Sequence, residues 1–165
     1  MPVITVQEAG SQNRLAFLDA IAWSEIGPAV LAETDNGYNC LVGSTPAHPL
    51  TFPSYARHPG ILNKELNSSA AGRYQLLFRY WLAYQRELHL PDFSPLSQDK
   101  IALQQIRERG ALGHIDSGNF ALAVGACSNI WASLPGNSYK QHTNPLSALR
   151  TAYVAAGGTL IQGIA

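Results

Sequence analysis

A proline-rich stretch in the first half of the chain constrains the fold more than any other sequence feature. Residues 46–60, PAHPLTFPSYARHPG, contain four prolines within 15 residues. Proline lacks a backbone N–H and fixes φ, so it interrupts helices and is confined to the edges of sheets. A long helix is therefore excluded there, and edge strands or ordered loop remain. Just before it, Glu33–Ser44 begins with a turn-forming Asp-Asn-Gly and continues into a short apolar run, which is the pattern of a turn followed by a strand.

Helical patterns lie on both sides of this small β region. Before it, the apolar spacing predicts a helix over Asn13–Glu25. After it, four segments combine helical periodicity with start and stop signals. They run from Ser68 or Ser69 to Pro91, from Ser94 through Pro95 to Gly110, from Asp116 or Ser117 to Pro135-Gly136, and over NPLSALRTAYVAAGG to Gly157-Gly158. We predict an α+β fold that is mostly helical, in a single domain over residues 1–165, with residues 1–12 as a loosely ordered N-terminal extension.

The composition is that of a globular protein, and it argues against several classes of partner. Of the 165 residues, 46% are hydrophobic and 13% are charged, and the 11 acidic and 11 basic side chains cancel. Without a basic excess there is no electrostatic basis for binding nucleic acid or anionic membranes. No apolar run reaches the ~18 residues of a membrane span, and the start, MPVITVQEAGSQN, lacks the basic region and apolar core of an export signal. We expect synthesis in the cytoplasm and no stable membrane insertion.

The cysteines and histidines show no pattern typical of a metal centre. Cys40 and Cys127 form no CxxC pair, and no two of the five histidines have the four-residue spacing of a zinc-binding helix. The two cysteines fit either one disulfide or two free, part-buried thiols, and the missing export signal favours free thiols. We predict neither a metal nor another cofactor.

Glu25 is the candidate catalytic residue that the sequence suggests by itself. It ends the apolar run LDAIAWSE, and in a helix Leu18, Ala22 and Glu25 share one face. Burial on that face, together with the negative end of the helix dipole, would raise the pKa of the carboxylic acid. An acid protonated near neutral pH is what general acid catalysis requires. In the alternative, Glu25 turns outward beside the helix-breaking Gly27-Pro28.

Four stretches, taken together, resemble the lambda-phage endolysin family of peptidoglycan lytic transglycosylases, whose fold is lysozyme-like. They are AFLDAIAWSE (16–25), AAGRYQLL (70–77), LPDFSPLSQDKIALQQIRERGAL (90–112) and CSNIWASLPG (127–136). The resemblance keeps order and spacing from about Arg14 to Gly158, nearly the whole chain. It implies a lysozyme-like fold, and it places Glu25 on the family's catalytic glutamate in a Trp-Ser-Glu motif.

The resemblance also implies a reaction. Glu25 would protonate the β-1,4 glycosidic oxygen between N-acetylmuramic acid and N-acetylglucosamine, and would then deprotonate the muramic acid C6 hydroxyl that attacks C1. The product carries a 1,6-anhydro end, and no second carboxylate is required. A hydrolytic muramidase or chitinase would use one, and Glu33 and Asp35, eight and ten positions after Glu25, are its candidates, unless they belong to a solvated turn. A non-catalytic module that binds glycan is the third hypothesis.

The remaining site residues are implied by the resemblance alone. Tyr74 and Gln75, in GRYQ, would lie at a helix start facing the saccharide cleft, although ordinary helix packing is an alternative for Tyr74. Other expected substrate contacts are Ser128, Asn129 and Tyr139, the last in a segment that resembles one lip of the cleft.

Two positions depart from the family pattern. Ile26 stands where relatives commonly have glycine, and Asn39, also an expected substrate contact, stands where they commonly have aspartate. Loss of that charge would lower the activity or retune it toward another glycan.

As an endolysin, the chain would act on peptidoglycan glycan strands during host lysis. Made in the host cytoplasm, it would need a partner, expected to be a holin, to reach periplasmic peptidoglycan. We expect a monomer.

Overall fold

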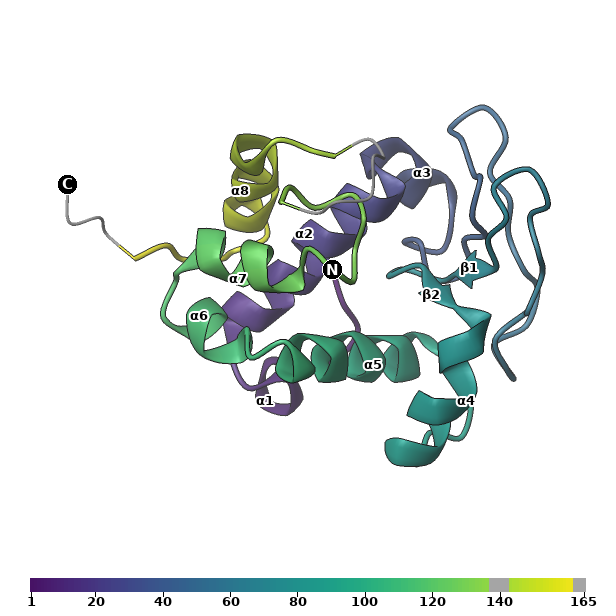
Figure 1. Ribbon diagram of the computed structural model, residues 1–165, viewed down its shortest axis with the longest axis horizontal. Helices are drawn as coiled ribbons and strands as arrows, with labels where there is room; N and C mark the ends of the chain where they lie inside the picture. The colour runs from purple at the N-terminus through teal and green to yellow at the C-terminus, as the bar shows by residue number, and fades with distance from the viewer. Residues whose placement is uncertain (137–142, 162–165) are drawn as a thin grey trace. The chain divides into compact units, whose positions relative to one another are not determined.

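The chain divides into two units in the computed structural model, which describes residues 1–136 and 143–161. Glu25–Ile101 form one unit, called here the middle unit. Met1–Ser24 and Ala102–Ala165 form the other, called the terminal unit. The boundaries fall within helices α2 (Gln12–Ile26) and α5 (Pro95–Glu108), labelled in Figure 1.

The middle unit has little regular structure between α3 and α4. Between α2 and α5 its elements are α3 (Pro28–Glu33), β1 (Ala70–Ala71), β2 (Leu76–Leu77) and α4 (Phe78–Glu87). The strands β1 and β2 form a short antiparallel hairpin in which Ala71 pairs with Leu76. The proline-rich stretch contains no helix, as predicted, and single bridges such as Cys40 with Thr51 connect it to its neighbours.

The helix predicted to start at Ser68 or Ser69 is wrong in its first part, because residues 70–77 form the β1–β2 hairpin and α4 begins only at Phe78. Two residues between the strands have left-handed backbone: Gly72 at φ +81° and Gln75 at φ +50°. A left-handed residue cannot continue a right-handed helix. Gln75 also closes the turn locally, since its backbone N–H and its Nε2 both donate to the Gly72 carbonyl, at 3.1 and 2.9 Å.

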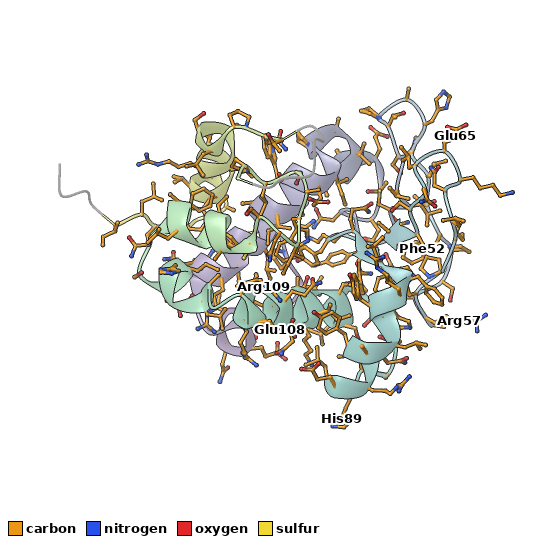
Figure 2. The ribbon with its side chains drawn as sticks, in the orientation of Figure 1. Phe52, Arg57, Glu65, His89, Glu108 and Arg109 are labelled. Atoms are coloured by element: carbon orange, nitrogen blue, oxygen red, sulfur yellow. The ribbon has the colours of Figure 1, made fainter. Side chains whose placement is uncertain are left out.

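Aromatic and aliphatic residues together form the core of the middle unit. Its buried members are Phe52, Ala71, Leu76, Trp81, Leu90, Phe93 and Ile101. Phe93 lies at the centre of the aromatic contacts, with Trp81 edge-on at a centroid distance of 5.1 Å. Phe52 points inward, whereas Arg57 and Glu65 are exposed on loops of the same unit (Figure 2).

The terminal unit is helical throughout its regular structure. Besides its parts of α2 and α5 it contains α1 (Val6–Ala9), α6 (Leu112–Asp116), α7 (Phe120–Cys127) and α8 (Leu146–Ala155). Helices α5 and α8 fit their predicted start and stop signals. Phe120 packs against Phe17 of α2 and Tyr153 of α8, with centroid distances of 5.9 and 4.7 Å. Within residues 1–12, Thr5 caps the single turn of α1 through a capping box with Glu8.

The helix predicted from Asp116 or Ser117 to Pro135-Gly136 is wrong in its extent, because α6 ends at Asp116 and the only helix within residues 117–136 is α7, Phe120–Cys127. Gly118, at φ +75°, separates α6 from α7. Helix α7 stops at Cys127, where the hydroxyl of Ser128 donates to the Gly125 carbonyl at 2.9 Å. Among the helices of the described residues, none has the length and apolar character required to cross a membrane.

Candidate functional site

Glu25 lies one residue before the end of α2, at the point where the middle unit begins. The residue before it, Ser24, is held in the terminal unit: its hydroxyl donates to Ser133 Oγ at 2.8 Å, and Asn144 Nδ2 donates to its carbonyl at 3.1 Å. Glu25 itself is half-buried, which is intermediate between the buried acid and the outward-turned acid that the sequence allowed. The hydrogen bonds of Ser24 therefore fix the backbone next to Glu25, and part of Glu25 is exposed to solvent.

The residue after Glu25 packs against the following turn. Gly37 has a left-handed backbone at φ +84°, and a Cβ placed on it would lie 2.8 Å from Ile26 Cδ1 and 2.7 Å from Leu31 Cδ2. Only glycine fits so close to these side chains. The turn that carries Asp35 and Asn39 thus rests directly on the last residue of α2.

The candidate second carboxylates, at the end of α3 and in that turn, are solvent-exposed. Glu33 and Asp35 are both exposed, and Asp35 accepts a hydrogen bond from the Tyr55 hydroxyl at 2.6 Å. Burial and the neighbouring Asp35 raise the pKa of that hydroxyl. Asn39 is half-buried, and its Oδ1 accepts the backbone N–H of Asp35 at 3.0 Å. The side chain of Asn39 therefore closes the turn, and Asp35 fits the solvated-turn alternative.

Tyr74 and Gln75 lie in the turn between β1 and β2, so the prediction that they start a helix is wrong. Tyr74 is only 4% exposed, and its hydroxyl donates to Asp99 Oδ1 at 2.6 Å. Burial, with the nearby Asp99 charge, raises the pKa of Tyr74 well above its usual range. Gln75 is half-buried. Gln75 thus retains exposed surface, whereas the Tyr74 hydroxyl is used inside the protein.

Residues that the sequence reasoning missed surround Tyr74. Asp99 on α5 is fully buried, and its Oδ1, which accepts the Tyr74 hydroxyl, also accepts a hydrogen bond from the Tyr38 hydroxyl at 2.8 Å. Arg73 is 1% exposed and lies over the rings of Tyr38 and Tyr74. One signal for Asp99 was available, since it is three residues before Ala102 on the buried stripe of α5. An acid in such a stripe indicates a buried partner.

Ser128 and Asn129 belong to the terminal unit. Ser128 is 8% exposed and caps α7 with its hydroxyl, whereas Asn129 is exposed. Tyr139 lies outside the described residues.

The chain was compared with known protein families, and a model of the family described as Endolysin matches residues 15–160. The endolysin of Escherichia phage lambda is 48% identical over 154 residues, covering 91% of this chain and 94% of that protein. The chain belongs to the endolysin family. The endolysin of Escherichia phage P2 is 46% identical over 167 residues, covering 96% of this chain and 98% of that protein.

Solved structures of a family member have the same fold. Bacteriophage lambda lysozyme, complexed with a chitohexasaccharide, matches with a TM-score of 0.82 at 46% identity, covering 91% of this chain and 97% of that one. A second structure of the lambda lysozyme matches with a TM-score of 0.79 at 45% identity and the same coverage. The predicted lysozyme-like α+β fold is confirmed, and this endolysin is a murein-degrading enzyme.

The two cysteines of this endolysin lack the properties of catalytic nucleophiles. Both are buried, free thiols. Burial raises the pKa of Cys127 to about 12, although the charge of Arg109 opposes it, and burial also raises the pKa of Cys40. A nucleophilic cysteine needs the opposite shift. Within residues 1–136 and 143–161, no three His, Cys, Asp or Glu side chains gather in a way that would hold a metal ion.

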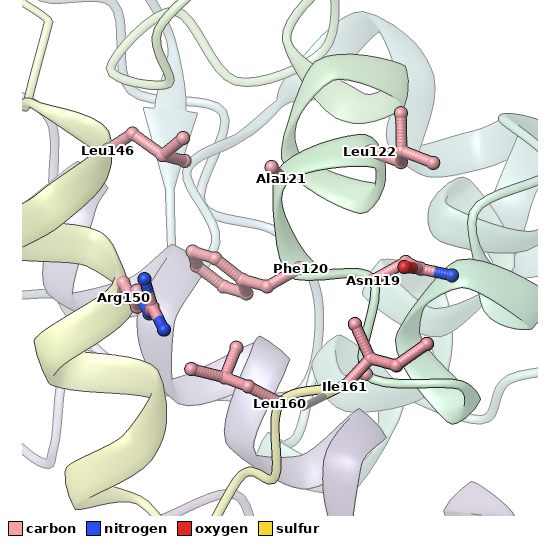
Figure 3. Close-up of a pocket in the computed structure, with 9 residues that line it drawn as sticks. Asn119, Phe120, Ala121, Leu122, Leu146, Arg150, Leu160 and Ile161 are labelled. Carbon is pink, nitrogen blue, oxygen red and sulfur yellow. The ribbon is translucent and has the colours of Figure 1, made fainter. Parts of the chain in front are cut away.

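An apolar pocket of about 320 Å³ in the terminal unit is separate from all of these residues. Phe120, Leu146, Arg150, Leu160 and Ile161 are among its lining residues (Figure 3). It contains none of the residues predicted to bind or cleave glycan.

Proposed function

We propose that this endolysin is a lytic transglycosylase that cleaves the β-1,4 bond between N-acetylmuramic acid and N-acetylglucosamine, with Glu25 as its catalytic acid and base. The observation that carries the proposal is the place of Glu25: half-buried at the end of α2, in the Trp-Ser-Glu motif of a chain 48% identical to the lambda endolysin. Because Glu25 is only partly buried, a glycosidic oxygen can reach it, as general acid catalysis requires.

The reaction needs one proton shuttle. Protonated Glu25 gives its proton to the glycosidic oxygen, and the bond from that oxygen to C1 of the muramic acid breaks. The Glu25 carboxylate then takes the proton of the C6 hydroxyl as the C6 oxygen bonds to C1. The 1,6-anhydro ring forms and Glu25 regains its proton. The attacking group belongs to the same sugar, so it is already held near C1.

The proposed reaction requires no second carboxylate, and the candidates at the end of α3 and in the turn after it fit that expectation. Hydrolases with two carboxylates hold both at defined separations across the glycosidic bond. Glu33 and Asp35 are exposed, and the Asp35 carboxylate accepts the Tyr55 hydroxyl. These contacts support a structural role for the turn and favour the transglycosylase over the hydrolase.

Glycan strands of peptidoglycan are the proposed substrate. The related lambda lysozyme has been solved with a chitohexasaccharide, an oligomer of the same backbone sugar type. Asn39 and Gln75, both half-buried, are proposed contacts, together with Ser128, Asn129 and Tyr139. For Tyr74 we propose a structural role that holds the turn in place, without direct contact with the glycan, because its hydroxyl is bound to Asp99.

The biological setting is also proposed. The endolysin is made in the host cytoplasm, acts as a monomer, and reaches periplasmic peptidoglycan through the action of a holin.

Mass spectrometry of the fragments released from purified Gram-negative peptidoglycan tests the reaction. Wild type is expected to release muropeptides with 1,6-anhydro ends, which are one water lighter than hydrolysed ends. Glu25→Gln keeps the shape but cannot exchange the proton, so its rate should fall by about 10²- to 10⁴-fold. Glu108→Gln, an exposed glutamate on α5, is the matched control and should behave as wild type.

Two other results would contradict the proposal. Reducing ends from wild type would indicate a hydrolase, and Glu33→Gln and Asp35→Asn would then identify its base. Equal release by wild type and Glu25→Gln would remove Glu25 from the chemistry.

A further inference from the structure

The most unusual buried group in the middle unit is the carboxylate of Asp99. It is fully buried on α5, and one of its oxygens accepts hydroxyl hydrogen bonds from Tyr38 at 2.8 Å and Tyr74 at 2.6 Å. A buried carboxylate is costly unless its hydrogen bonds are satisfied. Here the two donors come from two different segments of the chain, 61 and 25 positions away. Asp99 therefore joins parts of the unit that are distant in sequence.

Arg73 supplies a positive charge to the same cluster. It is 1% exposed, and its guanidinium carbon lies 5.3 Å from the centroid of the Tyr38 ring and 5.9 Å from that of Tyr74. A cation over an aromatic face is attracted to it, and more strongly when water is excluded. The Arg73 Nη1 also donates to the carbonyl of Asn36. The two tyrosines are thus held by their hydroxyls and by their rings.

Gln98 completes the connection between α5 and the two turns. Its Oε1 accepts the backbone N–H of Arg73 at 2.9 Å, and its Nε2 donates to the carbonyls of Tyr38 at 3.0 Å and Phe93 at 2.9 Å. Because Gln98 is 3% exposed, little water is available to replace these bonds. The backbone on either side of the cluster is therefore fixed together with the side chains.

The anchored residues are direct neighbours of the proposed glycan contacts. Tyr38 precedes Asn39, and Tyr74 precedes Gln75. The same turn as Tyr38 includes Gly37, which packs on Ile26, the residue after Glu25. All of these residues belong to the middle unit. A shift of Tyr38 or Tyr74 moves Asn39 or Gln75 with it.

We propose that Asp99, with Tyr38, Tyr74 and Arg73, is a positioning network that sets where Asn39 and Gln75 meet the sugar chain. Asp99 is fully buried, so it acts only through its neighbours. The inference rests on the proposed function for the identity of the substrate. The inference assigns a positioning role to residues that do not themselves contact the glycan.

A role in stability alone would make a different prediction. Buried charged clusters can often be replaced by apolar residues with little loss of stability, so their presence is weak evidence for a stabilising role. Positioning, in contrast, depends on the direction of each hydrogen bond. Small displacements of substrate-holding groups can slow an enzyme by as much as about 10²-fold.

The test compares Asp99→Asn, Tyr38→Phe and Tyr74→Phe with a matched control, Tyr153→Phe. Tyr153 is also buried, and its hydroxyl donates to the Thr159 carbonyl at 3.1 Å, but it belongs to the terminal unit and is not part of the Asp99 network. All variants are assayed for fragment release well below the unfolding temperature of the least stable one. We expect Asp99→Asn to lower kcat/KM about 10- to 100-fold, each network tyrosine variant to lower it less, and Tyr153→Phe to stay within twofold of wild type.

A binding measurement makes the test independent of turnover. In the Glu25→Gln background, chitohexaose binding is measured by calorimetry, and the side-chain amide signals of Asn39 and Gln75 are followed by NMR. Asp99→Asn should weaken binding severalfold and shift both amide signals, whereas Tyr153→Phe should do neither. If Asp99→Asn does not fold, Tyr38→Phe and Tyr74→Phe each remove a single hydroxyl and carry the same prediction.

The outcomes separate the two proposals. Absence of fragments from wild type would refute the proposed reaction, and the binding arm would still decide the role of Asp99. If the network variants and Tyr153→Phe change binding, amide signals and kcat/KM equally, the network is only structural and the inference is overturned.

Discussion

Gly72 offers a test of how the hairpin turn is held, because an added methyl group would meet the buried side chain of Gln98, which makes three hydrogen bonds. A Cβ on Gly72 would lie 2.2 Å from Gln98 Oε1 and 3.2 Å from Phe93 Cζ. The backbone is also left-handed, at φ +81°. Gly72→Ala therefore combines backbone strain with a steric clash. Gly110→Ala is its matched control, with φ +68° and nothing within 4 Å of the added atom.

The two costs can be separated. A left-handed alanine costs about 1–2 kcal/mol, and this is the whole expected effect of Gly110→Ala. At Gly72 the flexible end of Gln98 must also rotate away, which breaks its three buried hydrogen bonds with Arg73, Tyr38 and Phe93. At about 1 kcal/mol for each bond, the expected total for Gly72→Ala is about 4–5 kcal/mol. The difference between the variants, about 3 kcal/mol, measures the Gln98 contacts.

Equilibrium unfolding in urea, followed by tryptophan fluorescence, gives both values. Gly72→Ala should lower the free energy of unfolding far more than Gly110→Ala. In a Gln98→Ala background, Gly72→Ala should cost only the about 1–2 kcal/mol of a left-handed alanine, since the Gln98 bonds are already lost and the clashing atom is gone. A difference between Gly72→Ala and Gly110→Ala below about 1 kcal/mol, the size of one hydrogen bond, would refute the reasoning.

Three further predictions concern other parts of the chain. Burial acts to raise the pKa of Asp116, but hydrogen bonds from Arg14 and Ser11 and the charge of Arg14 outweigh it, so the pKa is lowered. The contribution of Asp116 to stability is therefore present above its unfolded pKa and is lost as the pH falls through its folded pKa. Asp116→Asn should therefore lower the free energy of unfolding in urea at pH 7, by less than about 1 kcal/mol for this partly exposed pair, and have little effect once the pH is below the folded pKa. Cys40 and Cys127, 2% and 0% exposed, should react with a thiol reagent at pH 8 only after urea is added, and rapid labelling of the folded protein would contradict their burial. Trp81→Ala, at a 2%-exposed core position, should lower the free energy of unfolding by about 3–5 kcal/mol, and a loss below 1 kcal/mol would show that the core refills the cavity.

Helix α5 shows what local sequence signals can specify. Ser94, Pro95 and Gly110 predicted its limits, and the helix runs from Pro95 to Glu108. Each signal acts through its own backbone: proline suits the first helical turn, and Gly110 takes the left-handed conformation, at φ +68°, beyond the end. No distant residue is needed, so a short window of sequence is enough.

The hairpin and the end of α7 depend on contacts that a local window does not contain. The alanine- and leucine-rich AAGRYQLL fits a helix by propensity, but the backbone N–H of Arg73 is bound by Gln98, 25 positions further along the chain. Helix α7 stops at Cys127, whereas the sequence pattern continues to Pro135. Trp131, 2% exposed, is buried in the turns that follow. Tertiary packing overrides propensity at both places.

The same limit applies to the site. Glu25 could be selected from the sequence because its signal, an acid at the end of an apolar run, is local. Asp99 was missed because its partners are 61 and 25 positions away. The sequence of α5 alone does not show which hydroxyl groups donate hydrogen bonds to Asp99.

Ile26 and Asn39, the two positions that we expected to depart from the family pattern, differ in their physical setting. The side chain of Ile26 lies against the missing side chain of Gly37, since a Cβ there would lie 2.8 Å from Ile26 Cδ1. The turn therefore accommodates Ile26 without displacing the end of α2. Asn39 closes that turn by accepting the N–H of Asp35 through Oδ1, which an aspartate would do equally well. An aspartate at position 39 would thus keep this hydrogen bond and add only a negative charge, so we expect Asn39→Asp to act on the reaction through electrostatics.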